Sequence, residues 1–353
     1  MSAGSRIAVA MSGGVDSSVA AALLNEAGAQ VFGLMLRLQD GSEGQPNGCC
    51  APEDVAAARS VAGTLGIPFY VVDARDAFEK RVISAFVSGY AQGLTPNPCV
   101  ECNRTIRWGL LLEHARAMGA THLATGHYAR TEHDGTAYRL RAARDTAKDQ
   151  SYVLHVLTQS QLAQTVFPLG ELTKAQVRAH AQRMQLAAAH RPESQDLCFV
   201  QGDYRAFVAA RGISSHPGPI FDRKGNALGT HSGLSSYTLG QRKGLRVPAS
   251  EALFVLEKDL ARNALIVGGR KDVGRRQFSV NQVNWIAGAP PAEEFDAGVQ
   301  VRYHAPRVIG RITCTSPTDV CVHLTARHPD VAPGQSAVFY LDDFCLGGGI
   351  ITP

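Results

Sequence analysis

Residues 10–18, AMSGGVDSS, are the first group along the chain whose types and spacing suit chemistry. The apolar run RIAVAM precedes them and VAAALLNEAG follows, so the pattern predicts a strand, a glycine turn and a helix start. Backbone N–H groups at such a turn bind phosphate, aided by the helix dipole. The loop lacks the Gly-Lys-Ser/Thr ending of the nucleotide-hydrolysing P-loop, and it is not GxGxxG. The simpler alternative is a strand–helix turn with Ser17 as N-cap.

The spacing SGGxDS resembles the pyrophosphate loop of enzymes that split ATP between its α and β phosphates and so make adenylates. That resemblance implies that the loop holds the leaving pyrophosphate. Asp16 is then expected to bind Mg²⁺ together with ATP, and the hydroxyls of Ser12, Ser17 and Ser18 are expected to donate hydrogen bonds. The loop predicts that the protein binds ATP, but it does not indicate which substrate ATP activates.

Two cysteine segments suggest the second half of the chemistry. In TPNPCVECNRTIRW, residues 95–108, the prolines on both sides of Asn97 predict a stiff, extended loop, followed by a helix from about Asn103. Cys102 is then expected at a helix N-terminus beside Arg104, which favours thiolate over thiol. Cys198 lies far away, in ESQDLCFV. Adenylation with two cysteines suggests sulfur transfer, in which one thiol carries a persulfide and the other resolves it by forming a disulfide.

Simpler interpretations of the cysteines stay open. Cys198 alone suits a small buried hydrophobe. Cys99 and Cys102 form a CxxC that suits zinc or an iron–sulfur cluster, with further ligands from Cys49, Cys50 or Cys198, although no second CxxC completes a Cys₄ site. The remaining three, which fall in strand-like segments and suit core packing, are Cys314, Cys321 and Cys345.

The first part of the chain predicts an α/β domain that positions these groups. Strand-like segments alternate with helical patterns, which favours a parallel sheet that persists to about residue 200. The expected strands are 7–11, 31–36, 69–72 and 122–125, and the expected helices are 17–27, 52–65, 76–92 and 105–118. A further helix, LTKAQVRAHAQRMQL, has Thr173 as its expected N-cap.

The rest of the chain predicts two smaller units. Glycines and prolines become frequent after residue 203, which indicates short strands and turns in a small mixed module. Six strand-like segments without helices follow residue 275 and predict a small β-barrel or sandwich. The predicted domains are 1–203, 204–274 and 275–353.

The amino-acid composition limits the classes of protein to which the chain can belong. The chain has 353 residues, of which 45% are hydrophobic and 19% charged, which is typical of a soluble globular protein. Its net charge of +4 permits an acidic partner such as RNA without demanding one. No apolar run is long enough to span a bilayer and the first residues lack a signal-peptide layout, so we expect a cytoplasmic protein. The eight cysteines then favour metal or thiol chemistry over disulfide staples.

Ten blocks in order resemble the bacterial tRNA-specific 2-thiouridylases, over nearly the whole chain. They are AMSGGVDSS, GCCAPEDVAAARSVAGTLGIPF, TPNPCVECN, ATGHYAR, KDQSYVLHVL, FPLGELTKAQVR, ESQDLCFV, YTLGQRKGL, VRYHAP and LGGGII. The resemblance implies an ATP-binding PP-loop domain, a small tRNA-binding adaptor and a C-terminal β-barrel. It also implies ATP-dependent placement of sulfur at C2 of the wobble uridine.

The resemblance implies roles for residues that match the family's blocks. Cys102 and Cys198 would be the catalytic pair, with the persulfide on Cys198. The target base would face Asn97, Pro98 and Cys99. The ATP site would be formed by Ala10, Met11, Ser12, Gly13, Gly14, Val15, Asp16, Ser17, Met35 and Gly126. Contacts to tRNA would come from His127, Lys148, Asp149, Gln150, Arg302, Tyr303 and Gln335.

One position departs from some relatives, which carry an acidic residue where this chain has Cys99. A thiol cannot serve as a carboxylate base or an oxygen ligand, so a mechanism that needs that group is in doubt here, whereas a thiolate-ligated cluster is easier to build. The expected partners are the tRNAs for lysine, glutamate and glutamine, a persulfide donor or cysteine desulfurase, and a reductant. Three other functions stay open: another adenylating ligase, an RNA-binding iron–sulfur protein, and a non-catalytic sulfur carrier.

Overall fold

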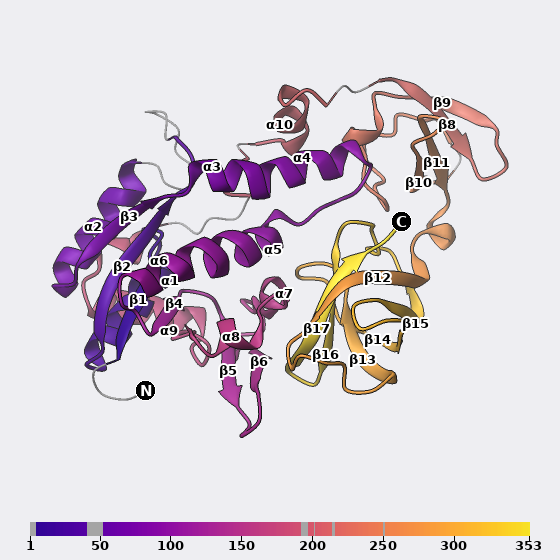
Figure 1. Cartoon of the computed structure of the whole chain (residues 1–353). Helices are drawn as coiled ribbons and strands as arrows, with labels where there is room; N and C mark the ends of the chain where they lie inside the picture. The colour runs from indigo at the N-terminus through magenta and orange to yellow at the C-terminus, as the bar shows by residue number, and fades with distance from the viewer. Residues whose placement is uncertain (1–4, 41–51, 192–196, 201, 214–215, 250) are drawn as a thin grey trace.

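A five-stranded parallel sheet forms the centre of the first domain (Figure 1). The computed structural model describes residues 5–40, 52–191, 197–200, 202–213, 216–249 and 251–353. The strand order is β3-β2-β1-β4-β7 and every pairing is parallel. The strands are β1 (Arg6–Ala10), β2 (Gln30–Arg37), β3 (Phe69–Asp73), β4 (His122–Thr125) and β7 (Thr165–Val166). The predicted α/β class is confirmed, although the last strand of this sheet ends well before residue 200.

The helix after the glycine loop begins earlier than the sequence predicted. α1 (Val15–Glu26) has Gly14 as its N-cap, so Ser17 lies inside the first turn. α9 (Lys174–Arg183) has the predicted cap: Thr173 accepts from the backbone N–H of Gln176 at 3.3 Å in a capping box. The other helices of this part are α2 (Pro52–Leu65), α7 (Ser151–Leu154), α8 (Gln159–Leu162) and a short 3₁₀ turn (Ala187–His190).

Two long helical segments run from the sheet toward the C-terminal barrel (Figure 1). The first comprises α3 (Arg75–Phe78), a π-helical turn (Glu79–Ile83) and α4 (Ser84–Ala91). The second comprises α5 (Pro98–Cys102), a π-helical stretch (Asn103–Leu111) and α6 (Leu112–Ala117). The prediction of a helix start near Asn103 was wrong, because Pro98 fits the first helical turn and Asn97 caps it. Cys99, not Cys102, therefore occupies the first turn.

A β-hairpin that the sequence analysis missed joins the first domain to the barrel. Its strands are β5 (Ala129–His133) and β6 (Tyr138–Ala142). β6 pairs with β17 of the barrel through Arg141↔Phe344 and Leu140↔Cys345. Arg130 and Arg141 both reach the carboxylate of Asp343, at 2.8 Å in the case of Arg141. The hairpin belongs by sequence to one domain and by hydrogen bonding to the other.

The middle of the chain forms the small mixed module that was predicted. α10 (Tyr204–Ala210) leads into a four-stranded sheet in the order β10-β11-β8-β9. Its strands are β8 (Gly218–Asp222), β9 (Ala227–His231), β10 (Phe254–Asp259) and β11 (Ala264–Gly268), with 3₁₀ turns at Leu234–Ser236 and Arg270–Asp272.

Six antiparallel strands close the C-terminal barrel, since β12 pairs with both β15 and β17. This settles the choice between barrel and sandwich. The strands are β12 (Arg275–Trp285), β13 (Glu294–Gln300), β14 (Val308–Cys314), β15 (Val320–His328), β16 (Ser336–Leu341) and β17 (Phe344–Ile351). The exact domain boundaries at 203/204 and 274/275 stay a proposal.

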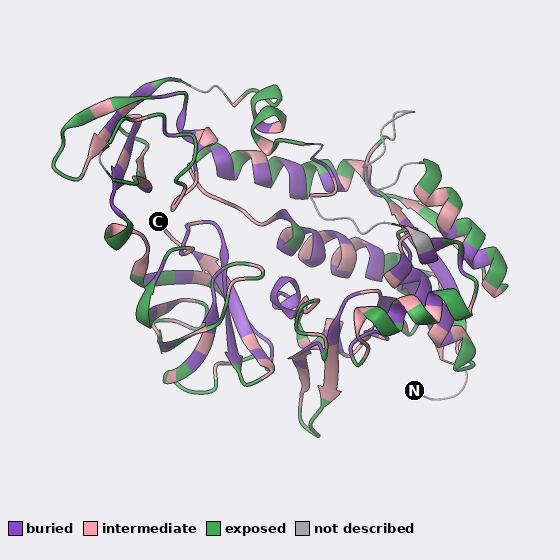
Figure 2. Ribbon diagram, turned by 180° about the vertical axis from the view of Figure 1, so that it is seen from behind, coloured by how far each residue is buried: buried purple, intermediate pink, exposed green. Residues whose placement is uncertain are grey.

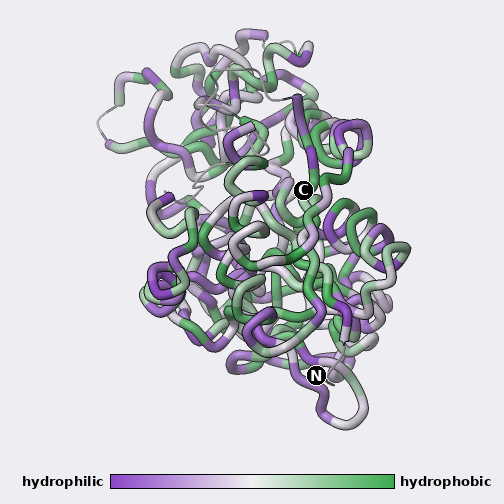
Figure 3. The backbone as a smooth tube through the Cα atoms, turned by 90° about the vertical axis from the view of Figure 1, so that its left-hand side faces the viewer, coloured by the Kyte–Doolittle hydropathy of each residue, from purple (hydrophilic) through white to green (hydrophobic). Residues whose placement is uncertain are grey.

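Burial follows the sheets. The central strands β1, β2 and β4 of the parallel sheet and the inner faces of the barrel are largely buried, whereas edge strand β3 and the outer faces of the flanking helices are exposed (Figure 2). Hydrophobic and hydrophilic residues are interspersed along the coloured tube (Figure 3). Within the described ranges, no helix combines the length and the apolar character that crossing a membrane requires.

Candidate active site

The glycine loop lies at the carboxyl end of β1 and leads directly into α1. Gly13 has φ +74°, a left-handed conformation that favours glycine. The side chains brace the loop from within: the backbone N–H of Ser12 donates to Ser17 Oγ at 3.1 Å, and Ser18 Oγ donates to the carbonyl of Gly14 at 2.8 Å. Because Gly14 brings no side-chain oxygen to cap α1, the first N–H groups of this helix are suited to an anion.

Asp16 is held by two residues that the sequence analysis missed. Lys174 Nζ lies 2.7 and 2.8 Å from the two carboxylate oxygens of Asp16, and the hydroxyl of Tyr128 donates to Oδ1 at 2.8 Å. The Lys174 side chain is only 12% exposed. Both residues stand in blocks already noted for their resemblance, LTKAQVR and ATGHYAR, but nothing in the spacing indicated that they meet Asp16. The arrangement places a cation beside the phosphate loop.

The other residues expected at the ATP site surround this loop. Gly126, at the end of β4, packs so closely on α1 that an added Cβ would lie 2.7 Å from the backbone nitrogen of Ser17. The side chains of Met11 and Met35 are buried in the core, so only their backbones can face a ligand. Ala10 ends β1 in register with Leu34 and Thr125 of the neighbouring strands.

His127 connects the nucleotide loop to the helix that carries the cysteines. It is 7% exposed, and burial together with the charge of Arg107 holds the pKa of its imidazole well below its ordinary value. Arg107 Nη1 donates to His127 Nε2 at 2.9 Å, so Nδ1 carries the proton and donates to Thr125 Oγ1 at 2.8 Å. A neutral histidine next to Gly126 thus orients a cation from the segment after α5.

The loop expected to face the target base is anchored at both ends. Asn97 accepts from the backbone N–H of Cys99 at 3.0 Å and so caps α5. Upstream, the backbone N–H of Thr95 donates to the carbonyl of Pro333, which belongs to the barrel. Cys99 is exposed, whereas Cys102 is 8% exposed.

Cys102 and Cys198 both pack in the extended apolar cluster on one side of the parallel sheet. Cys102 is a member of the buried cluster that lines one side of the parallel sheet, and half-buried Cys198 packs against the same cluster. Phe199, the next residue, stacks edge-on with Phe78 and Phe86 at 5.7 and 5.3 Å. Upstream, Arg191 Nη1 donates to the carbonyl of Gly13 at 3.0 Å, which ties this part of the chain to the phosphate loop.

The residues expected to contact tRNA fall into two groups. Arg302 is exposed, and Lys148 and Tyr303 are half-buried. Burial, with the charges of Asp149 and Cys99, raises the pKa of the Tyr303 phenol to about 12.

The second group makes hydrogen bonds within the protein. Asp149, with a side chain 11% exposed, accepts from Ser151 N at 3.1 Å and from Ser151 Oγ at 2.8 Å. Gln150 Oε1 accepts from the backbone N–H of Tyr128 at 3.0 Å. Gln335, 9% exposed, donates to the carbonyl of Thr95 at 2.8 Å.

The described residues offer little support for a metal site. In the part of the chain that the structure describes, no group of three or more His, Cys, Asp or Glu side chains could hold a metal ion. Cys49 and Cys50, named as further ligands, lie outside the described residues. Asp16 is suited to a single Mg²⁺ contact: a carboxylate has about four acceptor sites, and Lys174 and Tyr128 occupy only part of them.

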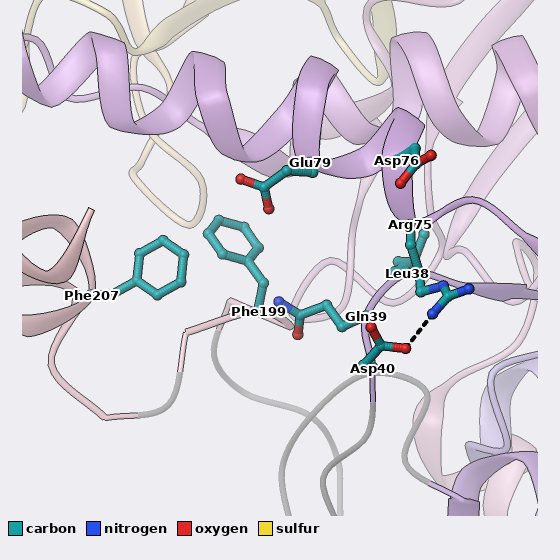
Figure 4. Close-up of a pocket in the computed structure, with 8 residues that line it drawn as sticks. All are labelled: Leu38, Gln39, Asp40, Arg75, Asp76, Glu79, Phe199 and Phe207. Atoms are coloured by element: carbon teal, nitrogen blue, oxygen red, sulfur yellow. Dashed lines mark hydrogen bonds and ion pairs between the residues drawn. The ribbon is translucent and has the colours of Figure 1, made fainter. Parts of the chain in front are cut away.

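A pocket of about 470 Å³ opens next to the Cys198 segment (Figure 4). It lies at the carboxyl ends of β2 and β3, where Arg75 and Asp40 form an ion pair. Phe199 and Phe207 line it from the segment that follows Cys198, with ring centroids 5.3 Å apart. Its position at the carboxyl edge of a parallel sheet is the usual one for ligands.

Families of known proteins match nearly the whole length of the chain. Residues 5–202 match the family described as tRNA methyl transferase HUP domain, residues 205–269 the tRNA methyl transferase PRC-barrel domain, and residues 275–351 the aminomethyltransferase beta-barrel domain. The chain is 49% identical over 351 residues to the tRNA-specific 2-thiouridylase MnmA of Chloroflexus aggregans, covering 98% of both chains. It is 45% identical over 355 residues to the protein of that name from Magnetococcus marinus, covering 98% of this chain and 99% of the relative.

Proposed function

The chain belongs to the family of tRNA-specific 2-thiouridylases, and we propose that it carries out ATP-dependent 2-thiolation of the wobble uridine of tRNA. One observation of the structure supports this most: both cysteine segments are tied to the phosphate loop. The Cys102 segment is tied through Arg107, which bonds to His127, the neighbour of Gly126. On the side of Cys198, Arg191, which lies upstream of it in the sequence, donates to the carbonyl of Gly13. These bonds support our proposal that ATP activation and sulfur delivery take place at one edge of the sheet.

Adenylation is the first step of the proposal. The uracil O2 attacks the α-phosphate of ATP, pyrophosphate leaves, and the oxygen becomes part of AMP, a good leaving group. The backbone N–H groups of the loop and the start of α1 hold the departing phosphates. Lys174 adds a positive charge at the same point, where it forms an ion pair with Asp16. Mg²⁺, when bound by Asp16 and phosphate oxygens, would supply further neutralisation of the leaving group.

Sulfur transfer is the second step. The terminal sulfur of a Cys198 persulfide attacks C2 of the adenylated uracil, and AMP departs. The Cys102 thiolate then attacks the inner sulfur, so the bond between the two persulfide sulfurs breaks and its electron pair stays on the sulfur now bound to C2. The product is 2-thiouridine with a Cys102–Cys198 disulfide. The two cysteines have supplied the electrons that reduce the sulfane sulfur, and an external dithiol restores them.

The barrel and the hairpin region are proposed to bind the RNA. Arg302 and Lys148 are placed to neutralise phosphates, which gives affinity without reading sequence. Half-buried Tyr303 is proposed to supply an aromatic ring on which an unpaired anticodon base stacks. His127, Asp149 and Gln150, which the resemblance also assigns to tRNA contacts, make hydrogen bonds within the protein.

The proposal predicts a specific pattern for cysteine variants. With ATP, tRNA and a persulfide donor, Cys198→Ser and Cys102→Ser should each lower single-turnover formation of 2-thiouridine by about 10³-fold or more, because each removes a reacting sulfur. Cys321→Ser, in the barrel, should keep the wild-type rate. Mass analysis of digested RNA measures the product.

The same experiment separates the two steps. Cys198→Ser should still release pyrophosphate in a first turnover that depends on tRNA, because adenylation precedes sulfur attack. Wild-type product formation by either variant would refute the assigned roles. Pyrophosphate release that does not depend on tRNA would point instead to another adenylating ligase.

A further inference from the structure

One carbonyl of the phosphate loop is held by a side chain from outside the loop. Arg191 Nη1 donates to the carbonyl oxygen of Gly13 at 3.0 Å, and Nη2 of the same guanidinium pairs with the carboxylate of Asp54, in the first turn of α2. The side chains of Arg191 and Asp54 are 31% and 21% exposed. The planar guanidinium therefore bridges α2 and the phosphate loop with two of its nitrogens.

This bridge is anchored on both sides. The backbone N–H of Arg191 donates to the carbonyl of Ala188 at 3.1 Å, and Ala188 and Ala189 are buried in the core. On the other side, α2 packs directly on Gly13: an added Cβ there would lie 2.5 Å from the carbonyl oxygen of Asp54 and 2.9 Å from Arg191 Nη1. Arg191 therefore meets the Gly13 carbonyl from a fixed position.

The bond to Gly13 also sets the direction of the next N–H group. The peptide between Gly13 and Gly14 is planar and trans, so its C=O and N–H point in opposite directions. With the carbonyl directed at Arg191, the N–H of Gly14 faces the other way, where Ser12 Oγ lies 3.4 Å from the Gly14 nitrogen. That bond is long, and the Ser12 hydroxyl lies on the side where phosphate is expected, so the Gly14 N–H is suited to an anion.

Glycine on both sides makes this peptide easy to turn. A half-turn of the peptide plane changes mainly ψ of Gly13 and φ of Gly14, and it would take φ of Gly14 from −85° into the positive region. Glycine adopts a positive φ at little cost. The turned peptide would present its carbonyl oxygen to the phosphates and repel them. The two glycines therefore permit two orientations, and the bond from Arg191 selects one of them.

We propose that Arg191 is a positioning residue for adenylation: it holds the Gly13–Gly14 peptide so that the Gly14 N–H faces the leaving pyrophosphate. This rests on the proposed function. An N–H donor that is already aimed at developing charge needs no reorganisation during the reaction, and the loss of one such donor costs about 10²-fold or more in rate. A peptide that is turned away for part of the time loses part of that advantage.

The test combines a change at Arg191 with a change that locks the peptide. Arg191→Met removes the donor and keeps an apolar stem. Gly14→Ala permits the present φ of −85° but makes the turned peptide costly, because alanine disfavours a positive φ. The full-length wild type, the two single variants and the double variant are compared. Two quantities are measured: single-turnover, tRNA-dependent AMP formation, and the dissociation constant for magnesium pyrophosphate.

We expect Arg191→Met to lower AMP formation by about tenfold in the wild-type background and by about twofold or less in the Gly14→Ala background. The dissociation constant for pyrophosphate should rise by similar factors. Because the comparison uses ratios, the cost of Gly14→Ala itself does not enter. Arg183→Met, which breaks the ion pair of Arg183 with Glu26 in the same domain, is the matched control and should leave both quantities unchanged.

Two results would overturn the positioning role. Wild-type AMP formation by Arg191→Met would show that the bond to Gly13 does not matter for the phosphates. An equal loss in the two backgrounds would show that Arg191 acts through its charge and not through the peptide. If Gly14→Ala forms too little AMP for a ratio, the pyrophosphate dissociation constants decide in the same way. A wild-type protein that binds pyrophosphate but forms no 2-thiouridine would instead refute the proposed function.

Discussion

The phosphate loop and the loop before α5 are held together in opposite ways. The hydroxyls of Ser12, Ser17 and Ser18 bond within residues 12–18, and the bonds from outside this loop come from the same domain, from Tyr128, Lys174 and Arg191. The loop at Thr95 takes its bonds from Pro333 and Gln335, in another domain. A self-braced loop survives changes elsewhere in the molecule, whereas a loop held from outside changes with whatever moves the other domain. ATP handling should therefore be a local property and sulfur delivery a property of the assembled molecule.

The largest expected effect tests the self-braced loop. Asp16→Ala should lower tRNA-dependent AMP formation by about 10³-fold, because it removes the carboxylate that holds Lys174 and is expected to hold Mg²⁺. AMP release measures it. Glu26→Ala, at the other end of α1, is the control and should be near wild type, since Glu26 is an exposed ion-pair partner of Arg183. Unchanged AMP release in Asp16→Ala would remove Asp16 from the ATP site.

The junction between the domains should respond to pH. His155 is fully buried between α7 and β17, and burial lowers its pKa to about 4 from 6.5. As pH falls below about 6.5, the unfolded chain gains a proton that the folded chain does not accept until about pH 4. The free energy of unfolding should therefore fall by about 3 kcal/mol over that range, at about 1.4 kcal/mol per pKa unit.

Urea unfolding at a series of pH values measures this loss of stability. His127, whose pKa burial also lowers, contributes a loss of the same sign in the wild-type protein. His155→Gln should be less stable at pH 7, because it disturbs the packing, but its stability should depend less on pH. An equal dependence in the variant would show that His155 is not the group that titrates.

The third prediction concerns Lys174 and its effect on AMP formation. Lys174→Met should slow AMP formation by about 10²-fold, because it removes a positive charge next to the leaving phosphates. Lys174→Arg should recover part of the rate. Lys224→Met, on an exposed turn of the middle module, is the control and should change nothing. If Lys174→Met formed AMP at the wild-type rate, its bond to Asp16 would be structural only.

The smallest expected effect is that of replacing Arg302, in the barrel domain. Arg302→Ala should weaken tRNA binding several-fold and lower the slope of log affinity against log salt by about 1, as expected for one phosphate contact. AMP formation at saturating tRNA should be unchanged. Arg311→Ala, exposed on the same barrel and paired with Glu294 and Asp296, is the control. Equal salt slopes in the two variants would place Arg302 outside the RNA interface.

Local patterns made much of the fold predictable. Alternating strands and helices predicted the parallel sheet, Thr173 predicted the start of α9, and six strand segments predicted a barrel or a sandwich, of which the structure has the barrel. The helix start at Pro98 was missed because a proline before a helix and a proline within its first turn look alike in sequence. The β5–β6 hairpin was missed because its hydrogen-bonding partner, β17, lies far along the chain.

The sequence by itself determined which reactive groups the chain contains: a phosphate loop at Ser12–Ser17 and two cysteines in segments far apart. Those features depend on residue types and on neighbours within a few positions, so they can be recognised from the spacing of residues in the sequence. Only the tertiary structure decided that Lys174 and Tyr128 meet Asp16, that His127 orients Arg107, and that Gln335 holds Thr95. Such contacts join residues up to 240 positions apart, and they arise from the packing of whole domains rather than from any local preference of the chain.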